Sequence, residues 1–233
     1  GIIEAGGVKN VTLALCKEFS LLKHKVTLFL PIFKSTNYDK LFNIQENVFQ
    51  NIEISHCGKT EFVSYDKAIC SEGNFEVILI KHPAFYEKED VYTYTEHEQL
   101  LNSQHVKGCG HSDSLFMNSL FAKAIYNYAL LLENGLPDII HCQDASTALI
   151  PAYFKSNTLF NKVKTVVTIH NAGPAYHHSF SSIGEAAWYT GFDQDLLVGS
   201  LNNCKVEPFL LALNSGANLS TVSEEYAKEL VDV

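Results

Sequence analysis

Polar and ionisable side chains follow two short apolar segments of the sequence, where they could do chemistry. His141, Gln143 and Asp144 close one segment, and His170 and Asn171 close the other. If the two segments are neighbouring parallel strands, these side chains lie at the carboxyl edge of a sheet, which is where ligands bind in open α/β folds. The pattern therefore predicts a binding or catalytic site at this edge.

Three further features belong to the same predicted edge. Gly6 and Gly7 stand directly before a predicted helix, where bare backbone amides can bind an anion such as phosphate, although a tight turn alone would also explain them. His82 follows another predicted strand, and Thr221 and Ser223 end a short one. Because two glutamates follow Ser223, we expect Ser223 to cap a helix whose first turn is acidic.

Each candidate also has a structural interpretation. Asp144 immediately precedes a predicted helix, which is typical of an N-cap. A satisfied core histidine is the alternative for His170, but its place in a Thr-Ile-His-Asn strand ending favours a site role. His177 and His178 stand nearby, yet the sequence has no H-E-x-x-H motif or Cys/His ligand spacing, so we expect no metal site.

The elements that would position these residues alternate along the chain. Short apolar runs predict strands at residues 25–31, 75–80, 138–142 and 164–169. Apolar spacing of three and four predicts helices at residues 8–22, 114–132 (closed by Asn134-Gly135), 145–154, 204–215 and 224–231. Strands rich in Val and Ile that alternate with helices indicate a parallel sheet covered on both faces. The predicted fold class is a doubly wound α/β domain.

Two segments depart from this alternation. Residues 48–57 and 60–68 read as strands joined by a short turn, which predicts a β-hairpin inserted in the α/β frame. Residues 86–111 are polar, aromatic and irregular, and we expect a long surface loop there. Long ordered loops in compact domains tend to be functional.

Composition and missing motifs exclude several classes of protein. The net charge of −9 argues against a nucleic-acid partner. The sequence has no uncharged apolar run of about 18 residues, so we expect no membrane span. Six scattered cysteines and no visible signal peptide favour a cytoplasmic protein with reduced thiols. The P-loop, G-x-G-x-x-G and G-x-S-x-G motifs are all absent, which argues against P-loop NTPases, classical dinucleotide-binding proteins and common serine hydrolases.

The order of the motifs resembles the N-terminal domain of bacterial glycogen and plant starch synthases, a family of retaining glycosyltransferases. Residues 4–11 occupy the place of the family's Lys-x-Gly-Gly-Leu-x-Asp-Val, and residues 26–33 that of its strand leading to Pro-x-Tyr. Residues 137–146 match Pro-Asp-Ile-Ile-His-x-His-Asp-Trp-His in part, residues 168–171 match Thr-Ile-His-Asn in full, and residues 221–229 are similar to Thr-Val-Ser-Pro-x-Tyr-Ala-x-Glu. These motifs cover the whole chain in the family's order.

The resemblance implies a function and a set of roles. The full protein would transfer glucose from ADP- or UDP-glucose, its co-substrate, to an α-1,4-glucan, with no metal or other cofactor. Gly6 and Gly7 would face the diphosphate, His170 would contact the glucosyl group, and Asp144 would sit at the acceptor side. Asn171 would order the loop as part of the substrate site.

The chain departs from the family pattern at several site positions. Glu4 replaces the lysine that contacts the phosphates in the family, and Asn10 replaces an aspartate. Ala145 and Ser146 stand where the family has Trp and His. A second hypothesis is therefore a catalytically degenerate glucan-binding or regulatory module, and a third is an unrelated sugar-nucleotide-dependent enzyme, since this fold hosts many functions.

The resemblance also implies a domain organisation. Residues 1–233 would form one Rossmann-like N-terminal domain, the first half of a GT-B type glycosyltransferase. The family's first strand would precede the glycine loop, and a nucleotide-binding C-terminal domain, absent from this chain, would be its partner.

Overall fold

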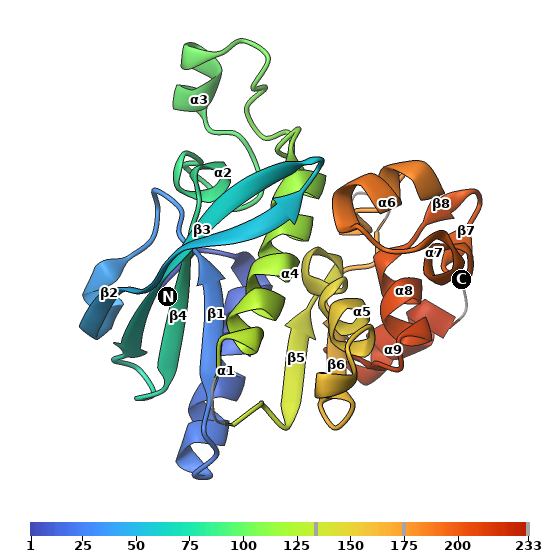
Figure 1. Cartoon of the computed structure of the whole chain (residues 1–233). Helices are drawn as coiled ribbons and strands as arrows, with labels where there is room; N and C mark the ends of the chain where they lie inside the picture. The colour runs from blue at the N-terminus through green and yellow to red at the C-terminus, as the bar shows by residue number, and fades with distance from the viewer. Residues whose placement is uncertain (133–134, 174–175, 232–233) are drawn as a thin grey trace. The chain divides into compact units, whose positions relative to one another are not determined.

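The computed structural model describes residues 1–132, 135–173 and 176–231, which form an α/β protein (Figure 1). The chain divides into two compact units. The first unit comprises Gly1–Ile54 and Glu61–Met117, and the second comprises Ser55–Thr60 and Asn118–Val233. No helix within the described ranges is long and apolar enough to cross a membrane.

The first unit is built on a four-stranded sheet of order β1-β4-β3-β2. Strands β1 and β4 pair in parallel, and β3 pairs antiparallel with β4, so the sheet is mixed. The predicted hairpin is present as β2 and β3, with both strands longer than expected. In chain order the elements are α1 (Gly6–Leu21), β1 (Thr27–Pro31), the 3-10 helix η1 (Tyr38–Lys40), β2 (Leu41–His56), β3 (Lys59–Cys70), β4 (Glu76–Lys81), α2 (Pro83–Tyr86) and α3 (Glu96–Leu101).

Burial in this sheet follows strand position. Strand β4 lies between β1 and β3, and its residues 77–80 are completely buried, as expected for a strand that is apolar on both faces. Strand β1 was expected to be buried as well, but all of its residues are half-buried. The difference arises because β1 is at the edge of this sheet.

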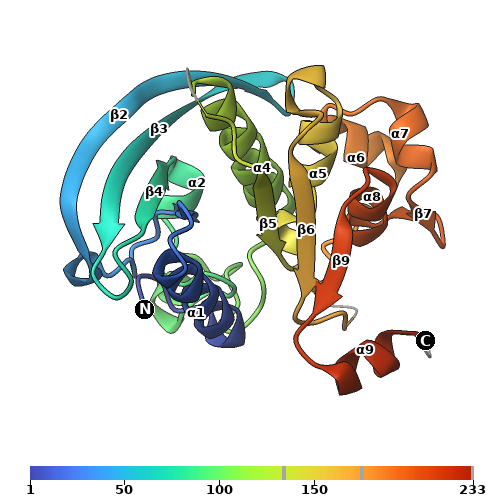
Figure 2. The same ribbon diagram turned by 90° about the horizontal axis from the view of Figure 1, so that it is seen from below.

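The hairpin strand β2 carries a local cause for its curvature. Asn43, Asn47 and Asn51 adopt left-handed backbone conformations, with φ of 51°, 53° and 53°. Asparagine tolerates this conformation, and residues of this kind within strands accompany bulges that bend the strand. The backbone amide of Asn47 donates to Asp66 Oδ1 at 2.7 Å. The side-chain Oδ1 of Asn47 accepts from Lys81 Nζ at 2.6 Å. Figure 2 shows the strong curve of both hairpin strands.

The segment of residues 86–111 is more ordered than a surface loop. It contains helix α3, which begins with a capping box in which Thr95 and Glu98 exchange side-chain and backbone hydrogen bonds. Tyr94, Glu98 and His111 are buried. The Thr-x-x-Glu pattern at residues 95–98 is the sequence signature of such a box, so the expectation of an irregular loop was wrong in this part.

The second unit is built on a three-stranded parallel sheet of order β5-β6-β9. Helices α5 and α8 pack against each other, and the buried face of β6 includes Val167 at 0% exposure. The elements are α4 (Ser114–Leu130, in this unit from Asn118), β5 (Ile139–Gln143), the 3-10 helices η2 (Ala145–Thr147) and η3 (Thr158–Phe160), α5 (Ile150–Lys155), β6 (Lys164–Ile169), α6 (Ile183–Thr190), α7 (Gln194–Val198), β7 (Leu201–Asn202), β8 (Lys205–Val206), α8 (Pro208–Asn214), β9 (Asn218–Thr221) and α9 (Glu224–Val231).

Prolines explain the two helices that differ most from expectation. The helix expected over residues 145–154 is split into η2 and α5, and Pro151 stands in the first turn of α5. Because proline has no backbone N–H to continue a preceding helix, an α-helix begins rather than continues there. Pro208 likewise starts α8, and Cys204 lies between β7 and β8 instead of in a helix. Of the predicted helix end Asn134-Gly135, Asn134 lies outside the described residues.

Candidate functional site

The predicted edge of the sheet exists in the second unit, at the carboxyl ends of β5 and β6. The two strands are parallel, and Gln143 is the register partner of Thr168. The residues that follow each strand therefore reach the same edge. There the structure brings together Asp144, His170 and Asn171, three of the predicted site residues.

Asp144 is the structural centre of this edge. Its side-chain Oδ1 accepts hydrogen bonds from the backbone amides of His170 at 2.7 Å and Asn171 at 3.2 Å. Its own backbone amide donates to the carbonyl of Thr168 at 2.9 Å. Asp144 makes no side-chain cap to η2, so the N-cap interpretation was wrong: the carboxylate binds the neighbouring loop instead.

The backbone of Asp144 is strained. Its φ of 61° and ψ of 178° lie in a region that is populated almost only by glycine. Such a conformation costs on the order of 1–3 kcal/mol and persists only where surrounding contacts impose it. Strain of this kind clusters at functional sites, and here the hydrogen bonds of Asp144 to Thr168, His170 and Asn171 hold the residue in place.

The ring of His170 is held by Gln143, which precedes Asp144. His170 Nε2 lies 2.7 Å from Gln143 Oε1, an acceptor, so Nε2 carries the proton. In the neutral ring Nδ1 then has a lone pair. His170 is half-buried rather than enclosed, which agrees with a site role better than with a core role. The sequence placed Gln143 at this edge but gave it no role of its own.

A second histidine belongs to a polar row across the sheet. His141 Nε2 lies 2.6 Å from Thr168 Oγ1, which lies 2.8 Å from Ser220 Oγ. Desolvation by surrounding protein lowers the pKa of His141, and the nearby His170 lowers it further. The row therefore favours a neutral imidazole at residue 141. Cys142 is buried in the same strand, and burial raises the pKa of its thiol to about 12, so it is no nucleophile.

Side chains from distant parts of the chain fix the loop after β6. Asn171 Oδ1 accepts from the backbone amide of Gly173 at 2.8 Å. The amide of Ala172 donates to the hydroxyl of Tyr226, from α9, at 2.6 Å. The Ala172 carbonyl lies 2.7 Å from His177 Nε2. No sequence signal linked Tyr226 to this loop, because the two are brought together only by the fold.

The other three predicted site residues, Glu4, Gly6 and Gly7, belong to the first unit. Helix α1 begins at Gly6, whose φ of 54° explains the glycine. A methyl group added at either Gly6 or Gly7 would meet nothing within 4 Å. Packing within the described chain therefore gives no reason for glycine at residue 7.

Glu4 is not an isolated charge. Its Oε2 lies 2.6 Å from Lys9 Nζ, in the first turns of α1. The hydrogen bond from Lys9 holds the pKa of Glu4 below its usual value, although the side chain is mostly exposed. The family's lysine is thus replaced by an acidic residue that is paired with a lysine five positions later.

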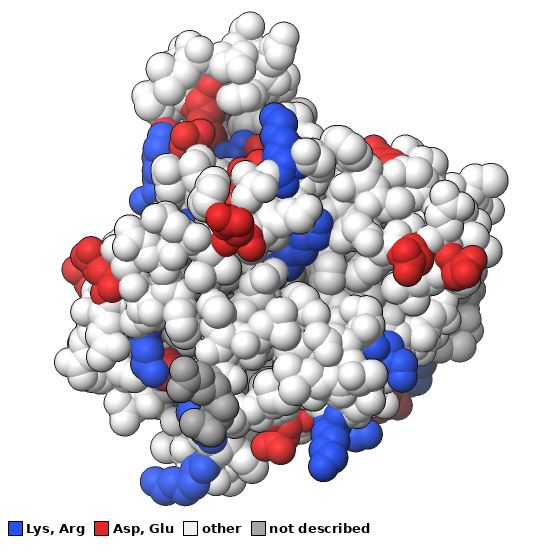
Figure 3. All heavy atoms as spheres, in the orientation of Figure 1, with Lys and Arg blue, Asp and Glu red and all other residues white. Residues whose placement is uncertain are grey.

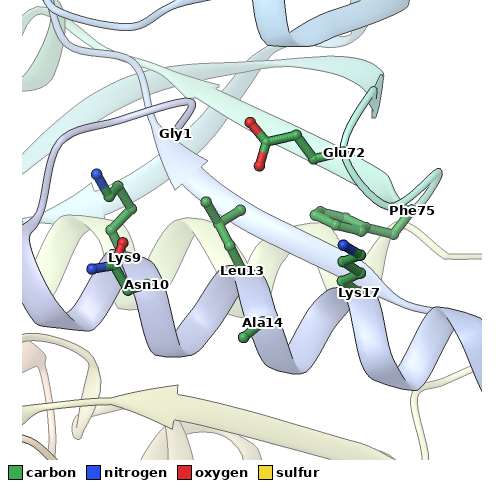
Figure 4. A pocket seen from close by; sticks show the side chains of 8 residues that line it. All are labelled: Gly1, Lys9, Asn10, Leu13, Ala14, Lys17, Glu72 and Phe75. Carbon is green, nitrogen blue, oxygen red and sulfur yellow. The ribbon is translucent and has the colours of Figure 1, made fainter.

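A shallow hollow of about 320 Å³ lies along the flank of α1. Figure 4 shows Lys9, Asn10, Leu13 and Lys17 from α1 facing it, with Glu72 on its other side. Glu4, Gly6 and Gly7 do not line it, although Lys9 and Asn10 from the same motif do.

The charged side chains on one face of the protein do not form a further candidate site. On the face shown in Figure 3, acidic and basic side chains are interspersed and neither sign gathers in one large patch. Within the described ranges, no three His, Cys, Asp or Glu residues form a group that could hold a metal ion.

Comparison with known proteins gives a consistent result. The sequence model of the starch synthase catalytic domain matches residues 1–233. The glycogen synthase of Thermodesulfovibrio yellowstonii is 29% identical over 250 residues, which cover 98% of this chain and 46% of the relative. The glycogen synthase of Koribacter versatilis is 26% identical over 174 residues, covering 73% of this chain and 32% of the relative.

A solved structure has a similar fold. The catalytic domain of starch synthase IV from Arabidopsis thaliana, bound to ADP and acarbose, matches with a TM-score of 0.77 and 22% identity. The match covers 97% of this chain and 43% of the other. The chain therefore spans less than half the length of these proteins.

Proposed function

Because the chain belongs to the family of starch synthase catalytic domains, we propose that the full-length protein transfers glucose from ADP- or UDP-glucose to the non-reducing end of an α-1,4-glucan. The similarity to curated glycogen synthases supports this proposal, as does the likeness in fold to a starch synthase bound to ADP and acarbose. The family predicted from the motifs is confirmed.

One observation carries the proposal: strained Asp144 holds the backbone of His170 and Asn171 at the sheet edge. A loop held by these hydrogen bonds is preorganised, so its polar groups need no reorganisation during the reaction. His170, half-buried and held by Gln143, is the group we place beside the glucosyl unit.

The remaining roles follow from chemistry. Gly6 and Gly7 would bring the positive end of the 16-residue helix α1 to the diphosphate, where an added side chain would block approach. Lys9, paired with Glu4, would supply the ammonium nearest this loop. Asp144 would orient the acceptor side through the loop it holds, and Asn171 would keep the following turn in place.

The site would be completed outside this chain. We propose that residues 1–233 act as the N-terminal domain and that a C-terminal domain supplies most of the nucleotide site. We expect a cytoplasmic protein, because its six cysteines, all within the described ranges, are in the thiol form. We expect the reaction to need no metal or other cofactor.

The test is incorporation of labelled glucose into glycogen by the full-length protein, with ADP-glucose and UDP-glucose compared. The proposal predicts transfer from one of them, and no transfer by residues 1–233 alone, since donor and acceptor groups must be held together. A full-length protein that binds glycogen but transfers glucose from neither donor would favour the degenerate glucan-binding module. Robust turnover by residues 1–233 would contradict the proposed domain organisation.

A further inference from the structure

We propose that His177 and Glu207 form a charged positioning pair that holds the loop after β6, and with it His170, in the geometry that glucosyl transfer requires. The role in transfer rests on the proposed function, but the pair itself does not. Neither residue was assigned a role by the sequence motifs. Both belong to the second unit, as does the loop they hold.

The contacts of His177 define the pair. Its Nδ1 lies 3.0 Å from Glu207 Oε2, and its Nε2 lies 2.7 Å from the carbonyl oxygen of Ala172. The Glu207 side chain is 11% exposed and that of His177 is 31% exposed. A largely buried carboxylate in contact with an imidazole interacts more strongly than an exposed surface pair.

Backbone hydrogen bonds hold Glu207 in place. It stands at the start of α8, where its amide donates to the Ser200 carbonyl at 3.0 Å and its carbonyl accepts from the Leu211 amide at 2.9 Å. Its side chain makes no cap to α8. The ring of Phe209 meets the His177 ring edge-on, with centroids 6.1 Å apart. The carboxylate is therefore held by α8 and directed to His177.

The two contacts of His177 require an extra proton. A neutral imidazole has one N–H, yet both partners of this ring, a carboxylate and a carbonyl, are acceptors. Both contacts are satisfied only if the ring is doubly protonated or if Glu207 is protonated. When this proton is lost, the ring can donate to Glu207 or to Ala172, but not to both.

A further titratable group, His178, follows His177 directly in the sequence. His178 interacts electrostatically with His177 and with Asp144, and burial lowers the pKa of His178. A neutral His178 adds no positive charge beside the pair. The hydroxyl of Tyr226 accepts from the amide of Ala172 on the other side of the loop.

The held peptide is close to the reacting residue. Ala172 lies two residues beyond His170, and its amide and carbonyl are bound by Tyr226 and His177 respectively. Asp144 holds the start of the same loop. Loss of the His177 contact would release the carbonyl side of Ala172 while the other anchors remain. The loop would then stay folded, but the position of His170 would be less well defined.

The test compares Glu207→Ala with Glu207→Gln in the full-length protein. Alanine removes the carboxylate that fixes the orientation of the His177 ring, so kcat should fall about 10- to 100-fold with little change in KM, the effect of a misplaced catalytic group. Glutamine can donate its amide N–H to Nδ1 while Nε2–H still donates to Ala172, so no extra proton is needed. Glu207→Gln should therefore keep most of the wild-type rate.

Glu225→Gln is the matched control, because Glu225 is 82% exposed on α9 and outside this contact. A readout without activity is NMR of the His177 ring nitrogens, in which wild type should show protons on both and Glu207→Gln on one. Hydrogen exchange of the Gly173 amide, which belongs to the peptide whose carbonyl His177 binds, should speed up in Glu207→Ala alone.

Equal kcat in wild type and Glu207→Ala at every pH would overturn the positioning role, as would equal losses in the Ala and Gln variants. If the wild-type protein transfers no glucose, the proposed function fails, while ring NMR and exchange still decide whether the pair holds the loop. A single ring proton in wild type, with unchanged exchange in Glu207→Ala, would overturn the pair itself.

Discussion

The carboxylate of Asp144 accepts the backbone N–H of His170 at 2.7 Å, across the ends of two neighbouring parallel strands. This contact links a strained residue after β5 to the predicted catalytic histidine after β6. It explains how an aspartate can remain in a backbone region that glycine prefers.

Substitutions of Asp144 should separate its strain from its hydrogen bonds. Asp144→Ala keeps the strain and leaves two amides without their acceptor, so we expect a loss of about 1–3 kcal/mol in unfolding free energy. Asp144→Gly also loses the acceptor but relieves the strain, so it should be more stable than the alanine variant by about 1 kcal/mol or more. Asp144→Asn, which retains an oxygen acceptor, should lose the least.

Urea unfolding of the three variants and wild type measures these differences. An alanine variant as stable as the glycine variant would mean that the backbone at residue 144 is not strained.

Substitution of Gly7 should affect stability and binding in opposite directions. Gly7 is the second residue of α1 and has open space around it, so Gly7→Ala should stabilise the fold by roughly 0.5–1 kcal/mol. The same methyl group would keep a phosphate away from the backbone amides, so ADP binding by the full-length protein should weaken about 10-fold or more.

Gly184 offers a matched control, because it is the second residue of α6 and also has space for a methyl group. Gly184→Ala should stabilise the fold without changing ADP binding. If Gly7→Ala binds ADP as wild type does, the glycine loop does not contact the diphosphate.

The ion pair between Glu4 and Lys9 predicts whether a change of charge at each residue strengthens or weakens nucleotide binding. Glu4→Gln would leave Lys9 without its carboxylate and remove a negative charge near the glycine loop, so ADP or UDP binding should become tighter. Lys9→Gln should weaken it. Both effects should shrink as salt rises, since the Glu4 side chain is 68% exposed.

Calorimetric titration of the full-length wild type and both variants with ADP and UDP, at two salt concentrations, measures these affinities. Unaltered affinity in both variants would show that neither side chain faces the nucleotide.

The histidine at residue 178 predicts how stability depends on pH. Burial lowers its pKa in the folded state, whereas the unfolded chain keeps the ordinary value of about 6.5. Below that pH the unfolded state binds more protons, so the free energy of unfolding should fall as the solution is acidified. His178→Asn removes this titration, and asparagine tolerates the φ of 48° at this residue.

Unfolding free energies at about pH 7.5 and pH 5.5 should differ less in His178→Asn than in wild type. Some dependence should remain, because the pKa of His141 is lowered as well. An unchanged difference would show that His178 titrates normally in the folded protein.

The sequence predicted the local elements and the sheet edge well, because both depend on nearby residues. Strand β6 begins and ends where its apolar run does, at Lys164 and Ile169. Ser223 caps the last helix as expected, accepting from the amide of Tyr226 at 3.1 Å. The α/β fold class is confirmed by the parallel pairing of β1 with β4 and of β5, β6 and β9.

Contacts between distant residues could not be predicted in this way. Glu207 and Ala172 are 35 positions apart, and His177 joins them only because the fold brings α8 beside the loop. The backbone strain of Asp144 has no sequence signal either, since an aspartate before a helix normally reads as a cap. These relationships depend on tertiary packing and not on local propensity.

The catalytic role of His170 is tested by the turnover number of the full-length protein with His170→Ala, measured as labelled glucose transferred to glycogen. We expect a loss of about 10²-fold or more, the range for losing one preorganised stabilising group, with a melting temperature close to that of wild type. Turnover equal to wild type would contradict a catalytic role and return His170 to a structural role at the end of β6.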